Sequence, residues 1–172
     1  MKKFPIKLFT LLILTAFSTA LFAQQNERTV SFHNFPFGTS MTAFKARMGN
    51  PVNTDQVNGL QSLIYENIPV SGYRAFMVAF FSNNGLEGGT YYFDTANLEE
   101  SMNCYTSLQR ELVAQFGETR LYEVLLRELR TYETSWNLPS GYIYLKLNTR
   151  TNDPVTLWYS SPSLTRRLNG GS

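Results

Sequence analysis

The chain has 172 residues, of which 43% are hydrophobic and 16% are charged, and its formal net charge at pH 7 is +2. Its single cysteine, Cys104, excludes a disulfide within the chain. Three of its 15 Lys and Arg residues lie within residues 1–23, which leaves 12 basic residues against 13 acidic ones and a net charge of −1. Because nucleic-acid-binding proteins need a clustered basic surface, this balance indicates that nucleic acid is not a partner.

Residues 1–23 have the features of a secretory signal peptide in the usual order. Three lysines precede an apolar run that starts at Leu8, and the chain becomes polar directly after Ala23. Export machinery recognises this succession of positive charge, apolar stretch and small residues. We expect cleavage after Ala23, with Ala20 as the alternative. A permanent anchor is less favoured, since a spanning helix needs roughly 20 apolar residues. The predicted location is periplasmic or secreted, with no integral membrane segment after cleavage.

Residues 24–161 are predicted to form one α+β domain. Apolar residues at helical spacing predict a helix over 41–48, which Thr39 or Ser40 caps. Strands are predicted over 60–68, 73–81 and 86–93. The second of these is almost wholly apolar, which indicates burial on both faces. The sequence Asn84-Gly85 favours a type I′ hairpin turn, and Gly88-Gly89 favours a bulge or a close backbone approach.

The second half repeats this order. A long apolar stripe predicts a helix over 98–116, capped by Asn97 and ended by Gly117. Residues 121–130 are ambiguous, although the Glu123–Arg127 spacing weakly favours a helix. Alternating residues then predict three short strands, over 131–138, 142–147 and 155–160. The polar residues 162–172 are expected to form a flexible tail.

The two halves can be overlaid on each other. The sequence FKARMG at 44–49 matches LVAQFG at 112–117, and IPVSGY at 68–73 matches LPSGY at 138–142. Both matches recur at nearly one period, because Gly49 and Gly117 are 68 residues apart and Gly72 and Gly141 are 69 apart. We therefore expect two tandem αβββ repeats, about 32–94 and 97–161, forming one antiparallel sheet with helices packed on one face. Two unrelated units that share turn residues are the alternative.

The first half also resembles a known pattern. The segments FGTSM (37–41), MGNP (48–51), LIY (63–65) and FFSNNGL (80–86) are similar to those of the small outer-membrane-assembly lipoproteins (SmpA/OmlA-like). Doubled, the pattern resembles the β-lactamase-inhibitor-protein-like fold. It covers about residues 37–93 and, more faintly, 97–160. The resemblance implies an exported bacterial α+β protein and, as one version of its function, an inhibitor of a secreted enzyme.

Catalytic chemistry has little support in the sequence. His33 is the only histidine, and a Ser or Cys nucleophile usually needs a histidine base; we expect a surface or capping residue. Cys104 lies in mid-helix and is expected to flank the core. Glu99 and Glu100 point about 100° apart on a helix and do not share a site. We expect no catalytic residue, no metal site and no cofactor. An enzyme with a dispersed carboxylate site, for example around Asp94, is the alternative.

The remaining candidate is an aromatic surface. Alternation in 142–147 places aliphatic residues toward the helices and leaves Tyr142 and Tyr144 on the open face of the sheet. Trp158 falls on the same side, and Tyr92 joins from the first half. Tyr and Trp dominate protein-binding hot spots, so these four residues predict an exported envelope protein that binds a protein partner. Ordinary cross-strand pairing of the rings is the alternative.

Overall fold

The computed structural model describes residues 28–119, 121–126, 129–150 and 154–170, and these residues form an α+β fold. The predicted signal peptide, residues 1–23, lies outside the described residues. The elements, in chain order, are β1 (Ser31–Phe32), β2 (Phe35–Pro36), α2 (Met41–Met48), β3 (Asn53–Val57), β4 (Leu60–Val70), β5 (Tyr73–Ser82), β6 (Gly85–Phe93), α3 (Leu98–Phe116), β7 (Leu121–Leu126), β8 (Leu129–Leu138), β9 (Gly141–Asn148), β10 (Val155–Ser160) and α4 (Pro162–Leu168).

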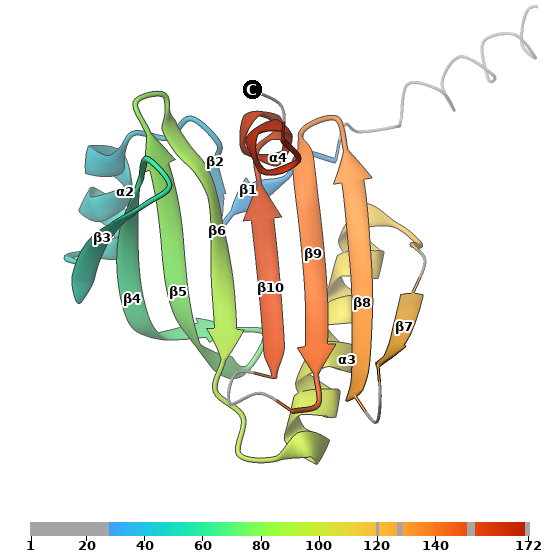
Figure 1. Ribbon diagram of the computed structural model, residues 1–172. Coiled ribbons are helices and arrows are strands. Elements are labelled where there is room, and N and C mark those ends of the chain that lie inside the picture. The colour runs from blue at the N-terminus through green and yellow to red at the C-terminus, as the bar shows by residue number, and fades with distance from the viewer. Residues whose placement is uncertain (1–27, 120, 127–128, 151–153, 171–172) are drawn as a thin grey trace, which may run out of the picture.

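Eight strands form one antiparallel sheet in the order β3-β4-β5-β6-β10-β9-β8-β7 (Figure 1). Helix α2 precedes the four strands β3 to β6, and α3 precedes the four strands β7 to β10, so each group has one strand more than the predicted αβββ unit. The last strands of the two groups pair with each other at the centre, where Tyr91 lies opposite Leu157. Strands β1 and β2 form a separate small hairpin.

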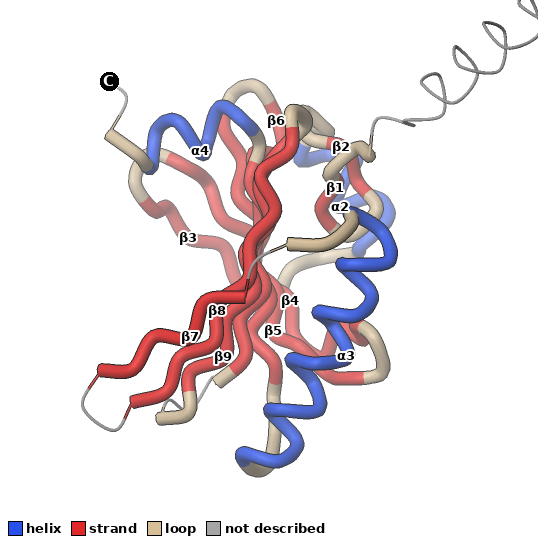
Figure 2. The backbone as a smooth tube through the Cα atoms, turned by 90° about the vertical axis from the view of Figure 1, so that its right-hand side faces the viewer, coloured by secondary structure: helices blue, strands red, loops and turns tan. Residues whose placement is uncertain are grey.

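Helices α2 and α3 lie on one side of the twisted sheet, whereas α4 lies on the opposite side (Figure 2). The core fills the space between the sheet and the first two helices, and it includes Phe44 from α2 and Leu108 from α3. The hairpin β1–β2 adds Phe32 and Phe35, which are 0% and 2% exposed. Burial of such aromatic side chains contributes most of the stability of an α+β core.

The predicted boundaries of α2 and α3 are confirmed. The Ser40 hydroxyl accepts a hydrogen bond from the Ala43 amide at 3.2 Å, and the Asn97 side chain accepts one from the Glu100 amide at 2.9 Å. Both helices end at a glycine with positive φ, 82° at Gly49 and 91° at Gly117. A side chain at such a position would clash with the backbone, which explains why glycine ends each helix.

The predicted flexible tail is wrong for residues 162–168, which form α4. The Ser161 hydroxyl caps this helix by accepting from the Leu164 amide at 3.1 Å. Pro162 occupies the first turn, where its missing N–H costs no hydrogen bond. Leu164 is only 2% exposed. A seven-residue helix with one buried side chain has too short an apolar pattern to be recognised in the sequence.

Several strand predictions also need correction. In the segment 121–130, for which a helix was weakly favoured, residues 121–126 form β7 and residues 129–130 begin β8, while 127–128 lie outside the described residues. Strand β3 was not predicted because all its residues are exposed, so it has no alternation. Strand β5 is not buried on both faces, since its exposure alternates and Phe76 is 37% exposed. The turn before β6 is not type I′, because φ is positive at Gly85 (98°) but not at Asn84.

Of the two alternatives predicted for Gly88-Gly89, the close backbone approach is confirmed at Gly88, where a Cβ atom would lie 2.5 Å from the backbone oxygen of Tyr159. The bulge falls one residue earlier. Phe80 lies opposite Gly88 and Phe81 lies opposite Leu86, so Glu87 is an extra residue in β6. A Cβ atom on Gly89 would lie 2.2 Å from the Phe32 ring. The glycine therefore allows the β1–β2 hairpin to pack directly onto the sheet.

Candidate functional site

The structure brings all four predicted binding residues to the open face of the sheet, away from α2 and α3. Residues that lie directly opposite each other on neighbouring strands share a face. Trp158 lies opposite Tyr144 on one side and Thr90 on the other. Tyr142 is two residues from Tyr144, and Tyr92 is two residues from Thr90. Because side chains alternate along a strand, both point to the same face as Trp158.

Two further aromatic residues, Phe76 and Phe80 of β5, lie on the same face. Phe76 packs against Tyr92, with ring centroids 6.3 Å apart, and Phe80 packs against Trp158 at 5.3 Å. The predictions missed both because the apolar run of β5 hides its alternation. We call the full set the aromatic face; its residues are Phe76, Phe80, Tyr92, Tyr142, Tyr144 and Trp158.

Tyr142 and Tyr144 are stacked at the β9 end of this face, with ring centroids 6.4 Å apart and an angle of 14° between the rings. Burial, together with the nearby Glu133 carboxylate, raises the pKa of Tyr144, so its hydroxyl stays protonated. Glu133 in turn pairs with Lys146 at 3.6 Å.

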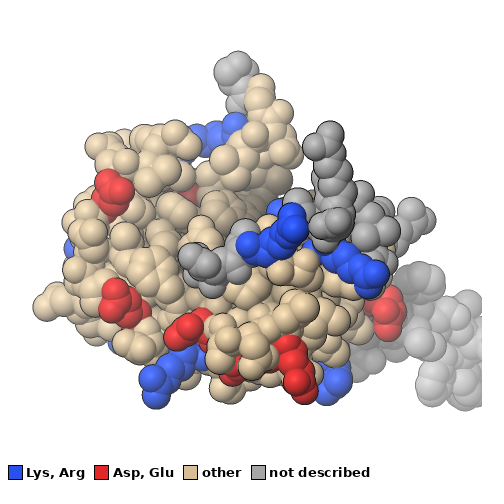
Figure 3. Space-filling view, turned by 60° about the horizontal axis from the view of Figure 1, so that its bottom comes forward, with Lys and Arg blue, Asp and Glu red and all other residues tan. Residues whose placement is uncertain are grey.

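On the lower side of the molecule, acidic and basic side chains are interspersed (Figure 3).

The buried floor of the aromatic face contains an unsatisfied polar atom. Thr90 is 0% exposed, and its Oγ1 has no hydrogen-bond partner in the described structure. The residue lies between Val78 of β5 and Trp158 of β10. A buried hydroxyl without a partner normally costs stability, so packing of the surrounding side chains holds Thr90 in place.

Helix α4 lies against the end of the aromatic face nearest the bulge. A hollow of about 230 Å³ separates the helix from the sheet, and Tyr142, Trp158 and the exposed Leu168 line it. The amide of Ser161 donates to the backbone carbonyl of Glu87 at 2.7 Å, which joins the start of the helix to β6. One end of the aromatic face is thus already in contact with a segment of the same chain.

The Glu87 carboxylate is the main polar contact of α4 with the sheet. It is 7% exposed and accepts hydrogen bonds from the hydroxyls of Ser82 (2.8 Å), Ser161 (2.5 Å) and Ser163. Burial alone raises the pKa of Glu87, but the three hydroxyl donors and the charge of Arg167 outweigh burial, so the pKa lies below its usual value. The group is therefore a charged acceptor at neutral pH.

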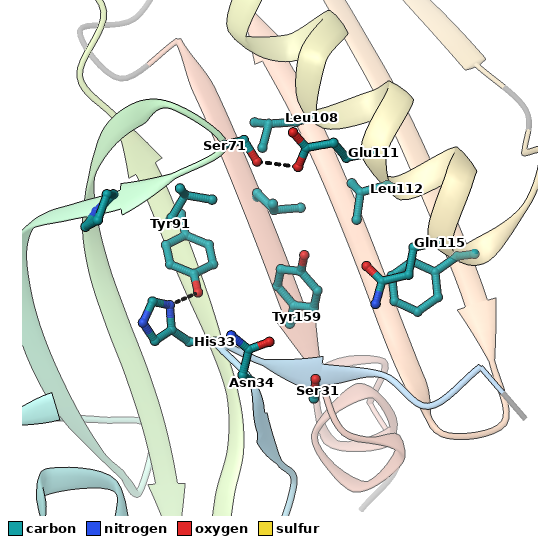
Figure 4. A pocket seen from close by; sticks show the side chains of 14 residues that line it. Ser31, His33, Asn34, Ser71, Tyr91, Leu108, Glu111, Leu112, Gln115 and Tyr159 are labelled. Atoms are coloured by element: carbon teal, nitrogen blue, oxygen red, sulfur yellow. Dashed lines mark hydrogen bonds between the residues drawn. The ribbon is translucent and has the colours of Figure 1, made fainter. Parts of the chain in front are cut away.

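A second feature lies on the other side of the sheet, beneath α3. A cavity of about 310 Å³ lies between the β1–β2 hairpin, the β4–β5 turn, α3 and the central strands (Figure 4). His33 Nδ1 and the Tyr91 hydroxyl form a hydrogen bond of 2.9 Å at one side of it. At the other side, the Ser71 hydroxyl donates to the Glu111 carboxylate at 2.5 Å.

Two residues singled out in the sequence have buried roles. His33 was expected at the surface, but it is half-buried because the β1–β2 turn, with φ of 50° at this residue, directs it toward Tyr91. Burial, and then the charge of Arg47, lowers the pKa of His33, so the ring is neutral at pH 7. Cys104 is 0% exposed, as predicted for a core thiol. Burial and the nearby Glu100 raise its pKa to about 12, which leaves the thiol unreactive.

The described residues contain no group of three or more His, Cys, Asp or Glu side chains that could bind a metal ion. Asp94 and Glu99 are both exposed. None of the helices in the described part of the chain combines the length and the apolar character needed to cross a bilayer.

Comparisons with known proteins do not assign the chain to a family. No family model matches the chain, and no curated protein sequence matches it. One similar solved structure is an extracellular protein containing an SCP domain from Bacillus anthracis, with 8% identity and a TM-score of 0.47; the alignment covers 85% of this chain and 52% of that one. This chain thus spans about half the length of that protein.

Another similar structure is a DUF4309 family protein (YjgB) from Bacillus subtilis. It has 9% identity and a TM-score of 0.46, and the alignment covers 76% of this chain and 84% of that one. Both TM-scores lie below 0.5, so neither neighbour indicates what this chain does.

Proposed function

We propose that this is an exported envelope protein that binds a protein partner through its aromatic face. One observation carries the proposal: six aromatic side chains lie on one face of the sheet, and their three ring pairs run from β5 across the central β6–β10 pair to β9. The rings lie in three contacting pairs on the same face of the sheet, rather than as single scattered residues. Such surfaces mark sites of protein interaction.

The chemistry of the rings suits a protein partner. Tyr and Trp combine a large apolar area with a polar tip, and they lose little conformational entropy on binding. Most rings of the aromatic face are half-buried, and Phe76 is 37% exposed. They are held in place by their neighbours yet retain area that a partner can cover. Preorganisation of this kind lowers the entropic cost of association.

The position of α4 supports a polypeptide as the occupant. This helix of the chain itself lies over one end of the aromatic face, where Leu168 lines a hollow with Tyr142 and Trp158 and the buried Leu164 lies against Gly88. The face therefore accepts a short amphipathic segment. We expect the partner to place a similar helix or loop on the rings that α4 leaves uncovered.

The proposal is tested by comparing partner binding of the wild type with that of a variant in which Tyr144 and Trp158 are both replaced by alanine. The protein would first be used to capture a partner from an envelope fraction, and the captured partner would then be purified and titrated by calorimetry. Two hot-spot residues each contribute about 2 kcal/mol or more. Since about 1.4 kcal/mol corresponds to a factor of ten, the double variant should bind the purified partner roughly 1,000-fold more weakly than the wild type.

The control is a second double variant, Val52→Ala with Leu98→Ala. These side chains are 60% and 53% exposed and lie outside the aromatic face. The control should bind as well as the wild type, and thermal unfolding should show that both variants are folded. Equal binding by the Tyr144→Ala/Trp158→Ala variant and the wild type would refute the proposal. If the captured partner is a secreted enzyme, an activity assay would test the inhibitor version of the function.

The carboxylate enzyme is the weaker candidate. Glu111 is the single carboxylate among the residues that line the cavity beneath α3, whereas paired-carboxylate catalysis needs two such groups. The aromatic face provides rings instead of a paired acid and base. Its composition therefore supports recognition over catalysis.

We also propose that the chain is a tandem duplication, with one unit at about 32–94 and the other at 97–161. Support comes from the matching order of one helix followed by four strands. The equivalent glycines Gly49 and Gly117 both end a helix and both donate to a carbonyl four residues earlier. Under this proposal, the aromatic face combines rings from both units and lies across their junction.

A further inference from the structure

The cavity beneath α3 has the dimensions and the mixed lining of a small-molecule site. Its volume of about 310 Å³ lies at the lower end of the range for such sites. Leu108, Leu112 and Phe116 of α3 form an apolar wall on one side, and Leu157 of β10 contributes from the sheet. A ligand that fits this space is small and has an apolar body.

Polar groups from separate elements converge on the same space. The Tyr159 hydroxyl points into it from β10, and the Gln115 side chain reaches toward it from α3 (Figure 4). The Tyr159 hydroxyl makes no hydrogen bond to another described residue, whereas the Tyr91 hydroxyl is bonded to His33. Tyr159 therefore offers an unused hydrogen-bonding group to a ligand. Its position is fixed by Tyr91, since the two rings meet edge to face with centroids 6.3 Å apart.

The charge of the lining selects the class of ligand. Glu111 is the one acidic side chain among the described residues that line the cavity, and the lowered pKa of His33 keeps that ring neutral at pH 7. The Glu111 carboxylate is exposed at the rim and is oriented by the Ser71 hydroxyl. Its second oxygen can accept from a ligand. The π faces of the tyrosine rings also attract cations.

We propose that this cavity binds a small organic cation: an amine whose charged group pairs with Glu111 and whose apolar body lies against α3. The Tyr159 hydroxyl accepts a further hydrogen bond from the amine or from a polar group on the body. The site lies on the opposite side of the sheet from the aromatic face. Binding here is therefore independent of the proposed protein partner, and either proposal can fail without the other.

The test uses three probes of nearly equal size and different charge: benzylamine, benzyl alcohol and benzoate. The ¹⁵N-labelled protein would be titrated with each at pH 7.5 and followed by amide chemical shifts in NMR spectra. Benzylamine should give saturable shifts in α3 around Glu111 and in β10 around Tyr159. Benzyl alcohol should bind more weakly, and benzoate should give no saturable shift at these positions.

The decisive variant is Glu111→Gln. The amide oxygen still accepts the bond from Ser71, but the charge is lost, so the affinity for benzylamine should fall about three- to fivefold, as expected for a solvent-exposed ion pair. Glu99→Gln, at the far end of α3, removes the same charge outside the cavity and should leave the affinity unchanged. The amide spectrum of each variant reports directly on whether it is folded.

Three results would overturn the proposal. Benzylamine could fail to shift the cavity amides, benzyl alcohol or benzoate could bind as tightly as the amine, or Glu111→Gln could bind benzylamine as tightly as the wild type. The first result would show that the amine does not bind in the cavity. Either of the other two would show that the cavity does not prefer a cationic ligand. Preferential binding of the amine that depends on Glu111 would support the site and its charge preference together.

Discussion

Two fully buried threonines on opposite faces of the sheet differ in a single hydrogen bond. The hydroxyl of Thr134, on the helix side, is bonded to the Tyr105 hydroxyl at 2.6 Å. Thr90, beneath the aromatic face, has no partner for its Oγ1. Since an unsatisfied buried hydroxyl costs free energy and a satisfied one contributes it, the same substitution should have opposite effects at the two positions.

We therefore predict that Thr90→Val leaves the free energy of unfolding unchanged or raises it by about 1 kcal/mol, because valine has the same shape and needs no partner. Thr134→Val should lower it by about 1–3 kcal/mol, since the buried Tyr105 hydroxyl loses its partner. Urea unfolding followed by tryptophan fluorescence measures both values. A large destabilisation by Thr90→Val would show that its hydroxyl is satisfied in solution.

At the residue scale, the sequence alone predicts which face of the sheet a side chain points to where polar and apolar residues alternate regularly. The period of two in β9 and β10 placed Tyr142, Tyr144 and Trp158 on the open face. Phe76 was missed because an uninterrupted apolar strand shows no face until its neighbours are known. The hydrogen bonds of Glu87 could not be predicted, because they depend on a bulge and on a helix that begins 75 residues later, at Pro162.

Among the elements, α4 depends on one buried carboxylate. Glu87 accepts from three serine hydroxyls, of which Ser161 and Ser163 belong to the start of α4. Hydrogen bonds to a charged group contribute about 1.5–3 kcal/mol each. A helix of seven residues is not stable by itself in water. The docking of α4 on the sheet should therefore weaken when this charge is removed.

The expected effect is local. Glu87→Gln should speed hydrogen exchange of the α4 amides, for example those of Thr165 and Asn169, by about tenfold or more, because about 1.4 kcal/mol of docking energy corresponds to a factor of ten. Exchange in β9 should not change. Ser163→Ala removes one donor of three and should have a smaller effect in the same direction. Unchanged protection of α4 in Glu87→Gln would show that apolar contacts such as Leu164 hold the helix.

The elements that were predicted and those that were missed differ in a physical way. The helices α2 and α3 have local caps and a long apolar stripe, so neighbouring residues determine them. Strand β3 is exposed along its length, and β7 has a spacing compatible with either structure. These strands form because a neighbouring strand offers free backbone groups. Their own residues do not show which strand that is, so the local sequence could not predict them.

For the whole molecule, two ionisable groups make stability depend on pH in separate ranges. Burial, and then Arg47, lowers the pKa of His33 from its ordinary value of 6.5. As the pH falls below 6.5, His33 binds a proton in the unfolded chain but not in the folded protein. The free energy of unfolding therefore decreases until the pH reaches the lowered pKa of the folded state. The lowered pKa of Glu87 acts in the same direction, but only below its ordinary value of 4.5.

We predict that the wild type is less stable to urea at pH 5.5 than at pH 7.5. The variant His33→Asn should lose less stability between these two values, since it removes the group that titrates there. Asparagine is the suitable replacement because it tolerates the positive φ at this position. An equal loss in the wild type and in His33→Asn would assign the pH dependence to other groups.

For a chain that is exported with its N-terminus first, the β6–β10 pair at the centre of the sheet also sets the order in which strands can pair. On the far side of the membrane β6 is complete once residue 93 has emerged, but its partner β10 consists of residues 155–160, the last strand that the structure describes. Until that segment is available, β6 is an unpaired edge with free backbone groups, a state prone to pairing with other chains. Contacts between distant segments also form slowly. A chaperone on the side where the chain emerges would therefore protect this protein while its first half is exposed and its last strand has not yet emerged.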